Sequence, residues 1–572
     1  GICRSILPNK LKFILMPKQN RRPGQRTSKG KIMKSNSIWA QKRWFSVSSF
    51  QFNAVYSAAV LVIYNPLFFK KFYEVSPSGL FFAAGLLCLF LLLNAACNIL
   101  LFRPVTKFLA VLLLLVNSVV YYFMITYNIA VDKVMLLNLL ETDVNEARET
   151  FSYSIFWYVA LLGVLPSAVV YKTEIRSRGW VGELVQRLFT IAVSLLIVAG
   201  VVFSGFKTTA QFMRNNKPLK YSLIPVNYFG AVVSLVKIKM TESSGPVEKI
   251  AVDASLKRYW QSPEKKNLLV IVAGETARAA NWGLNGYAVD TTAPLNPYRS
   301  EIFNFSDVSS CGTSTEVSLP CMFALEGRRD FNLWKAKRKE NLLDVAAATG
   351  YEVLWRDNNS GCKGVCARVE TESPCTTANC FDEILTEGLA GRLVASPRDR
   401  LIVLHQKGSH GPTYYLRYPE TAEVYKPACK TERLDKCSDE EIVNVYNNTI
   451  RYTAQNLADL INEFRKLGDI YNVTLVYMSD HGESLGENGI YLHAAPYRWA
   501  PEGQIKIPFM VWMSDTTADD LGIERACMEK YLQKPLSHDN LFHTALGILG
   551  IDTGVYEPEL DVFAGCRRHW GE

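Results

Sequence analysis

The chain has 572 residues, of which 49% are hydrophobic, and carries a formal net charge of +9, with 13 cysteines and 7 histidines. This length favours two or more domains, and long apolar runs confined to residues 51–205 exclude a disordered chain, a collagen-like chain and a simple cytosolic enzyme. The charge is local, because residues 1–43 hold 12 Lys and Arg and no acid, while the remainder carries 51 basic against 54 acidic residues. We therefore expect no nucleic-acid partner.

The basic tail spans residues 1–44 and is predicted to lie in the cytoplasm. The chain begins with Gly, and Met16 or Met33 is an alternative start. Residues 1–32 are interpreted as a low-complexity basic leader, outside the folded protein. Counting from Met33 removes nine positive charges, so the net charge falls from +9 to zero.

Residues 45–205 contain five apolar stretches, each near the roughly 20 residues that a helix needs to cross a bilayer. The stretches are 52–69, 79–101, 107–127, 154–172 and 187–205. Lys and Arg gather in the tail and in the loops after the second and fourth stretches, so the positive-inside rule places the N-terminus inside and residues 206–572 outside. The alternative is that one weak stretch is a buried core helix, which would reverse the side of the C-terminal part.

Two amphipathic stretches, 129–150 and 221–240, are too polar to cross the membrane. One interpretation is a pair of interfacial helices on the outer face of the bilayer. The other is helices that only pack on the soluble part. The second stretch lies in a linker predicted over residues 206–265.

Ten of the cysteines lie beyond residue 300. An even set in an exported domain is typical of disulfides formed in an oxidising compartment. Other pairings stay open, but nearest-neighbour pairing would join Cys311 with Cys321, Cys362 with Cys366, Cys375 with Cys380, Cys429 with Cys437, and Cys527 with Cys566. The rival interpretation is zinc binding at Cys362 and Cys366, whose spacing resembles that of a zinc finger.

Residues 266–572 alternate short apolar runs with helical stretches, which predicts an α/β domain with a mainly parallel sheet flanked by helices on both faces. The predicted strands are Asn267–Val272, Tyr351–Trp355, Arg400–His405, Val473–Met478 and Ile505–Trp512. In such sheets, ligand sites gather where the strands end.

Potential metal ligands and a hydroxyl follow these strands or lie in the loop between two of the cysteines. They are Glu275, Thr315, His405, His410, Asp480, His481 and His493. Carboxylate and imidazole ligands suit Zn²⁺, and a neighbouring metal can convert a hydroxyl into a nucleophile. Taken singly, each has a plainer interpretation: an Asp-His pair as a hydrogen-bonded turn, the Thr as structural, and Glu275 as a carboxylate at a helix N-terminus.

Five motifs carry a resemblance to a known family: GETAR (274–278), CGTSTEVSLPC (311–321), WRDNN (355–359), HQKGSHGPTYYLRYP (405–419) and SDHGESLGENGIYLHAAPY (479–497). With these motifs, the chain from about residue 45 resembles the alkaline-phosphatase/sulfatase superfamily. More narrowly, it resembles the lipid A phosphoethanolamine transferases, which include the mobile colistin-resistance enzymes. The resemblance implies a five-helix transmembrane domain in a Gram-negative inner membrane, bridging helices, and a periplasmic catalytic domain over residues 266–572.

The resemblance also implies roles for individual residues. Glu275, Asp480 and His481 would hold one tightly bound Zn²⁺, with Thr315 as fourth ligand and nucleophile. His410 and His493 would bind the substrate phosphate or a second zinc. Substrate contacts are expected at Asn358, Asn359 and Lys363.

The implied reaction has two steps. The Thr315 oxygen attacks the phosphate of phosphatidylethanolamine and releases diacylglycerol, and the resulting phosphothreonine passes phosphoethanolamine to lipid A of lipopolysaccharide. The added cationic group would weaken the binding of cationic peptides such as polymyxins. We expect a monomer.

Three rival functions are considered. Phosphoglycerol transfer, as in the lipoteichoic acid synthases, also combines five spans with a Thr nucleophile. A sulfatase is disfavoured because the chain has no Cys-x-Pro-x-Arg segment. A non-enzymatic membrane-anchored binding or sensor domain would make the ligand set a coincidence.

Overall fold

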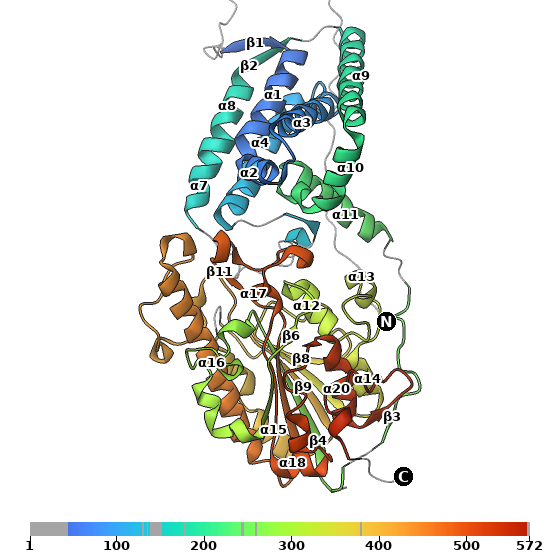
Figure 1. The fold of residues 1–572 in the computed structure, drawn as a ribbon, viewed down its shortest axis with the longest axis vertical. Helices are drawn as coiled ribbons and strands as arrows, with labels where there is room; N and C mark the ends of the chain where they lie inside the picture. The colour runs from blue at the N-terminus through green and yellow to red at the C-terminus, as the bar shows by residue number, and fades with distance from the viewer. Residues whose placement is uncertain are drawn as a thin grey trace, which may run out of the picture.

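The computed structural model describes residues 44–127, 131–133, 135–137, 152–176, 179–241, 245–257, 260–262, 264–377 and 380–568. A bundle of apolar helices lies at one end of the molecule and an α/β domain at the other, and helices of the linker lie between them (Figure 1). This arrangement agrees with the predicted division into an apolar N-terminal part and a soluble C-terminal part.

Four helical segments in the described part of the chain are long and apolar enough to cross a membrane. They are α3 (Gly79–Leu100), α4 (Thr106–Tyr127), the continuous run Ser154–Lys172 and α9 (Trp180–Ser204). The run Ser154–Lys172 comprises α7 (Ser154–Tyr158), a π-helical segment η1 (Val159–Val164) and α8 (Leu165–Lys172). The expected count of five is reached only if a fifth, bent pair of helices is one span.

That bent pair is α1 (Ser49–Tyr64) and α2 (Pro66–Val75), whose axes differ by 76°. The expected first span, 52–69, runs across this break. Pro66 is the first residue of α2, where a backbone N–H would have no partner within that helix. The same missing N–H cannot continue the hydrogen bonds of α1, so α1 ends before it. Asn65 fixes the break, because its side chain accepts a hydrogen bond from the Ile224 backbone N–H (2.8 Å) and donates one to the Ile224 carbonyl (3.0 Å).

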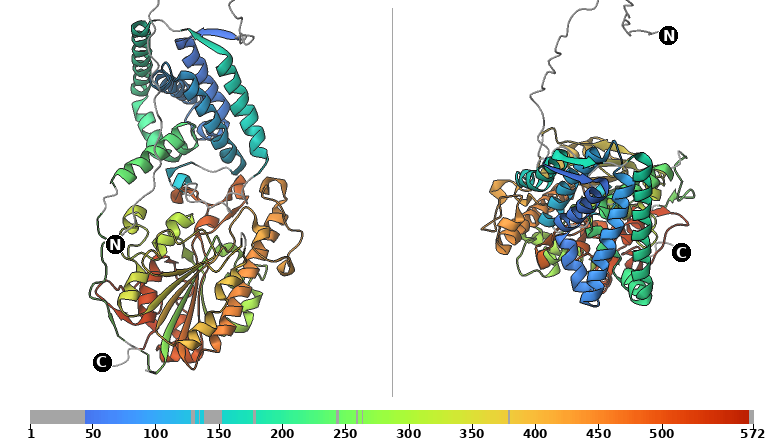
Figure 2. Two further views of the ribbon diagram at one scale, coloured as in Figure 1. Left: turned by 180° about the vertical axis from the view of Figure 1, so that it is seen from behind. Right: turned by 90° about the horizontal axis from the view of Figure 1, so that it is seen from above.

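A short parallel strand pair closes the end of the bundle that lies away from the α/β domain (Figures 1 and 2). It joins β1 (Phe45–Ser48) to β2 (Thr173–Arg176). The segment before α1 and the segment after α8 therefore lie side by side at the same end of the bundle.

The linker is largely helical, with α10 (Phe206–Asn215), a 3₁₀ turn η2 (Lys217–Ser222) and α11 (Val226–Thr241). The second amphipathic stretch thus forms α11 and part of η2, whereas the first, 129–150, lies mostly outside the described residues. After α11, β3 (Ser255–Leu256) pairs with β15 (Ile551–Asp552), so the chain already contacts the α/β domain before residue 266.

The α/β domain is built on a seven-stranded sheet of order β5-β13-β10-β4-β9-β7-β8. The pairs from β10 through β8 are parallel, while β13 and β5 are antiparallel to their neighbours. The sheet is thus mainly parallel, as expected. Its strands are β5 (Ile302–Phe305), β13 (Phe509–Met513), β10 (Tyr471–Ser479), β4 (Lys266–Gly274), β9 (Arg400–His405), β7 (Glu352–Asp357) and β8 (Glu370–Glu372).

The last predicted strand, Ile505–Trp512, is displaced in the structure. Its first residue ends a helical turn, α17 (Glu502–Ile505), and the strand itself is β13. Apolar runs do not distinguish a strand start from a helix end, because both bury the same residue types.

Helices cover both faces of the sheet. Successive side chains of a strand point to opposite faces, and in β4 Leu269 and Ile271 join one apolar cluster while Leu268 and Val270 join another. The first cluster includes residues of α14 (Leu342–Ala348) and α20 (Asp539–Leu549), and the second includes the long helix α16 (Asp439–Arg465). The smaller elements are β6 (Val308–Ser309), α12 (Thr315–Met322), α13 (Leu333–Ala336), α15 (Leu389–Ala395), β11 (Ser484–Leu485), β12 (Tyr491–Leu492), α18 (Asp515–Asp520), α19 (Arg525–Met528) and β14 (Leu536–Ser537).

The ten cysteines of the α/β domain form five disulfides, each between nearest neighbours in sequence. The bonds join Cys311–Cys321, Cys362–Cys366, Cys375–Cys380, Cys429–Cys437 and Cys527–Cys566. The zinc-finger interpretation of Cys362 and Cys366 is therefore wrong, because both sulfurs are used in a disulfide.

Candidate active site

Two neighbouring parallel strands deliver the central carboxylates. In the sheet, Ser479 at the end of β10 is paired with Gly274 at the end of β4. The next residues are Asp480 and Glu275, so the strand register places the two acids side by side, and both are buried. The Thr276 backbone N–H donates to Asp480 Oδ1 (3.0 Å), which ties the two strand ends together.

The turn after Glu275 is held by tight backbone packing. Thr276 has a left-handed backbone, with φ of 59°. Gly408 lies against this turn with φ of +50°, and a Cβ there would lie 2.6 Å from the Glu275 carbonyl oxygen. Only glycine fits such a close approach without strain, and the neighbouring Ser409 N–H then donates to the same carbonyl (2.9 Å).

Glu275, Asp480 and His481 bring three metal-ligating atoms within 4.8 Å of one another. His481 Nε2 lies 3.4 Å from Glu275 Oε1 and 3.4 Å from Asp480 Oδ2. Four ligands in a tetrahedron around zinc stand about 3.4 Å apart, given bonds of about 2.0–2.1 Å. Asp480 Oδ2 is buried and makes no hydrogen bond within the described chain. The residues therefore fit a tetrahedral zinc ion in both spacing and chemistry.

The electrostatics of the three residues also favour a cation among them. Burial, together with the charge of Glu275, raises the pKa of Asp480 to about 6. Burial would lower the pKa of His481, but the charge of Asp480 and contact with Glu275 raise it to about 10. Burial would raise the pKa of Glu275, yet its hydrogen bond with His481 holds that pKa well below the ordinary value. Two buried carboxylates thus require a positive charge between them.

The hydroxyl of Thr315 faces this group. Thr315 Oγ1 lies 3.0 Å from Glu275 Oε2, 3.2 Å from Glu275 Oε1 and 3.4 Å from His481 Nε2. Thr315 is the first residue of α12, and a helix N-terminus favours negative charge. The Cys311–Cys321 disulfide links the two ends of the segment that contains it.

Two further histidines flank the carboxylate group. The ring of His493 lies 4.4 Å from that of His481 and 5.5 Å from that of His410, measured between ring centroids. His493 Nδ1 is 3.3 Å from Glu483 Oε1. Burial lowers the pKa of His410 to about 3, so its ring is neutral at neutral pH.

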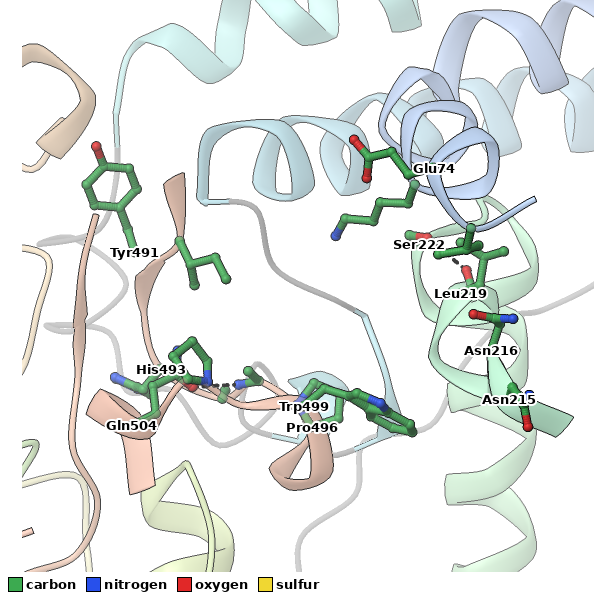
Figure 3. Close-up of a pocket in the computed structure, with 16 residues that line it drawn as sticks. Glu74, Asn215, Asn216, Leu219, Ser222, Tyr491, His493, Pro496, Trp499 and Gln504 are labelled. Carbon is green, nitrogen blue, oxygen red and sulfur yellow. Dashed lines mark hydrogen bonds between the residues drawn. The ribbon is translucent and has the colours of Figure 1, made fainter. Parts of the chain in front are cut away.

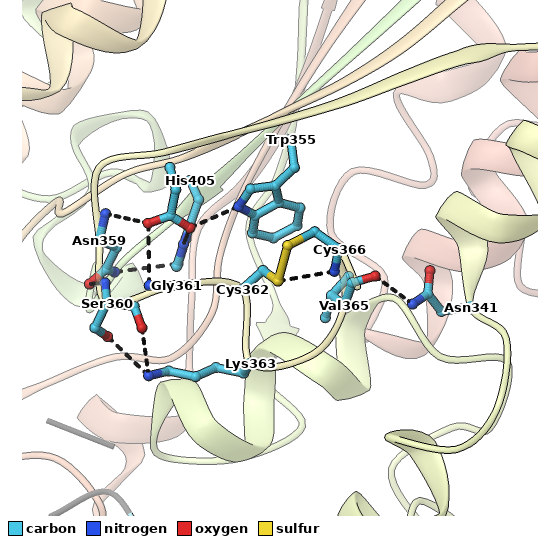
Figure 4. The surroundings of a disulfide bond; sticks show 11 residues. Asn341, Trp355, Asn359, Ser360, Gly361, Cys362, Lys363, Val365, Cys366 and His405 are labelled. Atoms are coloured by element: carbon cyan, nitrogen blue, oxygen red, sulfur yellow. Dashed lines mark hydrogen bonds and ion pairs between the residues drawn. A yellow bond between two sulfur atoms is a disulfide. The ribbon is translucent and has the colours of Figure 1, made fainter. Parts of the chain in front are cut away.

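The three expected substrate contacts differ from one another. Asn359 Nδ2 donates to Glu275 Oε2 (2.8 Å), so this residue orients a potential ligand. Asn358 is buried and donates to Asp382 Oδ1 (2.8 Å), within the scaffold. Lys363 Nζ bonds to the carbonyl of Ser360 (3.0 Å). Figure 4 shows Lys363 within the loop that the Cys362–Cys366 disulfide closes, and Asn359 just before that loop.

His405 lies behind the same loop rather than in the ligand group. Its Nδ1 is 3.0 Å from Asp357 Oδ2, and its Nε2 is 3.3 Å from Asn359 Nδ2 (Figure 4). His405 is fully buried. It therefore supports Asn359, which in turn contacts Glu275.

Comparisons with known proteins agree with this geometry. A family model described as phosphoethanolamine transferase EptA/EptB matches residues 89–240, and a sulfatase model matches residues 267–551. The chain is 34% identical to phosphoethanolamine transferase EptA of Escherichia coli K12, over 89% of this chain and 95% of the relative. This chain belongs to the phosphoethanolamine transferase family. The family resemblance inferred from the five motifs is thereby confirmed.

Other members of the phosphoethanolamine transferase family extend the match. The chain is 34% identical to phosphatidylethanolamine transferase Mcr-1 of Escherichia coli, over 85% of this chain and 93% of the relative. Among solved structures, the integral membrane lipooligosaccharide phosphoethanolamine transferase A of Neisseria meningitidis superposes with a TM-score of 0.87 at 37% identity, covering 92% of this chain and all of that one. The similarity therefore includes both the apolar helices and the α/β domain.

A cavity of about 350 Å³ opens beside this site, between the apolar helices and the α/β domain (Figure 3). His493, Pro496 and Trp499 line it from the α/β domain, and Lys71 and Glu74 line it from α2. The site of this phosphoethanolamine transferase family member is thus accessible from the side that carries the apolar helices.

One buried histidine escaped the sequence analysis. His538, just before α20, accepts a hydrogen bond from the Cys311 N–H at Nδ1 (3.1 Å), and its Nε2 lies 2.9 Å from the Ser479 carbonyl. Nε2 must donate to that carbonyl, so the ring is a neutral, single tautomer, and burial lowers its pKa to about 4. His538 links the loop that begins at Cys311 to the end of β10. Its only sequence signal is the Ser-His-Asp start of an apolar helix, which is weak.

Proposed function

We propose that this protein transfers phosphoethanolamine from phosphatidylethanolamine to lipid A through a covalent intermediate on Thr315. The family relationship gives the class of reaction. The lipid A acceptor follows from the relatives, one of which is named Kdo(2)-lipid A phosphoethanolamine 7''-transferase. We propose in addition that Zn²⁺ is the cofactor.

The observation that carries the proposal is the position of Thr315. Its hydroxyl lies at a helix N-terminus, within 3.0–3.4 Å of a Glu carboxylate and a His nitrogen that can share a metal. A Thr hydroxyl is a weak nucleophile unless a neighbouring base or metal removes its proton. A plain structural threonine would not need three buried titratable residues around it.

Glu275, Asp480 and His481 would hold the zinc ion, and Thr315 would complete the set. When bound, zinc supplies a positive charge that favours the alkoxide of Thr315 and the charge of the transferring phosphoryl group. Asn359 keeps Glu275 in the ligating orientation through its 2.8 Å hydrogen bond. His481 Nδ1, which is 2.9 Å from the Gly482 carbonyl, fixes the ring so that Nε2 faces Thr315.

In the first step, Thr315 Oγ1 forms a bond to phosphorus, and the bond from phosphorus to the diacylglycerol oxygen breaks. The hydroxyl proton of Thr315 passes to water, and the departing diacylglycerol oxygen takes up one proton in exchange, so protons balance across the step. We assign the second proton transfer to His493, which lines the cavity and is oriented through Nδ1 by Glu483. The neutral His410 ring can donate its N–H to a phosphoryl oxygen.

In the second step, an oxygen of the lipid A acceptor attacks the phosphorus of phosphothreonine. The bond to Thr315 Oγ1 breaks, and the enzyme is regenerated. A covalent intermediate allows two bulky lipids to use one site in turn rather than together.

Two features of the fold support a membrane arrangement. We propose that α1 and α2 make one broken crossing, which gives five spans in all. The β1 strand lies at the end of the bundle away from the α/β domain, whereas α2 lines the cavity beside that domain. With the basic tail in the cytoplasm, the α/β domain would lie in the periplasm of a Gram-negative bacterium. The disulfides support this placement, because they form in oxidising compartments.

Mass spectrometry of lipid A tests the function directly. Cells that express the parent protein should gain a lipid A species carrying phosphoethanolamine, and cells that express Thr315→Ala should not. A phosphoglycerol adduct would instead favour the lipoteichoic acid synthase type of reaction. A phosphoethanolamine adduct that persists in Thr315→Ala would contradict the assigned nucleophile.

A further inference from the structure

A second cavity, of about 660 Å³, lies wholly on the α/β domain. Its lining includes three cations and two aromatic rings, namely Arg328, Arg329, Lys534, Tyr497 and Tyr531. Nothing in the transfer mechanism above uses these residues.

The cations of this cavity are stacked on its aromatic rings. The Arg328 guanidinium lies 4.5 Å from the centre of the Tyr497 ring, and Lys534 Nζ lies 3.8 Å from the centre of the Tyr531 ring. Neither of these cations, nor Arg329, forms an ion pair within the described chain.

Of the three carboxylates in the lining of this cavity, only Asp561 forms an ion pair within the described chain, so two carboxylates stand against three cations. Asp561 pairs with Arg567 (3.3 Å), and Asp539 accepts a hydrogen bond from the Arg328 backbone N–H (2.9 Å). Glu559 is the remaining acid of the lining. The cavity therefore offers more uncompensated positive than negative charge, which suits an anionic ligand.

The two cavities are separated by one segment that is bonded to the nucleophile loop. Pro496 lines the first cavity and Tyr497 lines the second. The Ala494 N–H donates to the Thr313 carbonyl (2.6 Å), and the Tyr497 hydroxyl donates to the Ser310 carbonyl (2.8 Å). The segment between the two cavities is thus hydrogen-bonded at two points, Ala494 and Tyr497, to the loop that carries Thr315.

We infer that the second cavity is the acceptor subsite and binds a phosphorylated saccharide. The rings of Tyr497 and Tyr531 hold Arg328 and Lys534 in place, and an arginine guanidinium binds a phosphate group in a bidentate manner. The first cavity adjoins the apolar helices and so suits the diacylglycerol donor. This assignment rests on the proposed function, since it gives the two lipids of that reaction separate approaches to one threonine.

Charge reversal in the second cavity tests the assignment. The double variant Arg329→Glu/Lys534→Glu changes two exposed side chains that touch no ligand of the proposed zinc site. Lys530→Glu is the matched control, because Lys530 also stacks on Tyr531 (5.2 Å) but does not line the cavity. All variants are full-length proteins in vesicles that contain phosphatidylethanolamine.

Two acceptor lipids and two assays separate the donor step from the acceptor step. Transfer is measured with bisphosphorylated lipid A and with lipid A from which both phosphates have been removed. Diacylglycerol release without acceptor reports the first step alone. We expect the double variant to raise the KM for bisphosphorylated lipid A by about tenfold or more, as lost charged hydrogen bonds imply. Diacylglycerol release, transfer to the dephosphorylated acceptor, and the Lys530→Glu control should stay within about twofold of the parent.

The alternative outcomes are distinct. An unchanged KM for the bisphosphorylated acceptor overturns the subsite, and so does an equal loss of diacylglycerol release, which would place the variant's effect on the donor step. A parent protein that releases no diacylglycerol and transfers nothing overturns the proposed function itself.

Discussion

The carboxylate of Glu275 is held from several sides by residues of different loops. Asn359 donates to Oε2, Thr315 Oγ1 lies 3.0 Å from the same oxygen, and His481 Nε2 is 3.4 Å from Oε1. A ligand held this firmly loses little conformational freedom when a metal binds. Asn359 would therefore act on the proposed zinc ion through Glu275.

Replacing Asn359 should weaken zinc binding. Asn359→Ala removes the hydrogen bond to Glu275, and loss of such a supporting partner weakens metal affinity by about 10–100-fold. Lys363→Ala is the matched control, because Lys363 lies on the same loop but bonds only to Ser360 within the described chain. Zinc affinity is measured by competition with a chelator. Equal affinities for the two variants would show that Asn359 does not orient the ligand.

His538 should matter for rate as well as for stability. His538→Ala leaves the Cys311 N–H and the Ser479 carbonyl without their partner, at a cost of about 2–4 kcal/mol in the free energy of unfolding. Because these groups adjoin the nucleophile loop and Asp480, kcat should fall by about tenfold or more.

His543→Ala provides the comparison for His538. His543 is also buried in α20, but it accepts a hydrogen bond from the Glu557 N–H (3.0 Å), away from the ligand group. It should lower the melting temperature while leaving kcat near that of the parent. If both variants slow the reaction equally, His538 has no special role in positioning.

At this scale the sequence predicted which three potential ligands come together, but not the residues that support them. Glu275, Asp480 and His481 follow apolar runs, and parallel strands place their ends at one edge. The hydrogen bonds of Asn359 and His538 join loops that are far apart in sequence, so only the folded structure reveals them. Asn358 and Asn359 are adjacent, and only the fold shows that one contacts Glu275 and the other Asp382.

Among the elements, α12 and the Cys311–Cys321 disulfide set the position of Thr315, the proposed nucleophile. The Cys311–Cys321 bond joins residues 10 apart in sequence, and Thr315 lies between them. The Cys527–Cys566 bond joins residues 39 apart, and its loop does not contain Thr315. A disulfide restricts the unfolded chain, and this restriction grows with the length of the closed loop. Removing the Cys311–Cys321 bond should therefore lower the free energy of unfolding by about 3 kcal/mol, and removing the Cys527–Cys566 bond should lower it by about 4 kcal/mol.

Activity should follow the opposite order. Replacing both Cys311 and Cys321 by Ala should reduce transfer more than replacing Cys527 and Cys566, although the second pair costs more stability. Thermal unfolding and lipid A transfer are measured on the same preparations. A greater loss of transfer in the variant that lacks Cys527 and Cys566 would contradict a local role for the first disulfide.

The broken helix shows what hydropathy leaves out. Residues 52–69 are mainly apolar, so their average hydropathy predicts a single span. The break at Asn65–Pro66 depends on a proline and on the two hydrogen bonds of Asn65 to Ile224, which lies 159 residues further along the chain. The α/β domain was predictable in outline, yet the antiparallel β13 was not, because an apolar run carries no direction.

The whole molecule has two ends with different environments in the proposed arrangement. Pro77, between α2 and α3, should lie on the periplasmic side, and Phe102, between α3 and α4, on the cytoplasmic side. A membrane-impermeant maleimide added to spheroplasts should label Pro77→Cys at once and Phe102→Cys only after permeabilisation. The parent protein is the control for native thiols. Labelling of both positions from outside would contradict a membrane crossing by α3.

At the scale of the whole molecule, the two cavities are the proposed sites of the two lipids, the donor and the acceptor. One adjoins the apolar helices and the other lies on the α/β domain, and the segment between them is bonded to the loop that carries Thr315. This relation was not visible in the sequence, because the residues that line each cavity come from distant segments.

Covalent modification of Thr315 is the central claim, and peptide mass spectrometry tests it most directly. The full-length protein is incubated with phosphatidylethanolamine in the absence of lipid A, quenched in acid and digested. The peptide that contains Thr315 should carry phosphoethanolamine on that residue, and addition of lipid A before quenching should remove it. An unmodified Thr315, or an adduct on another residue, in a preparation that still transfers phosphoethanolamine to lipid A would contradict the account.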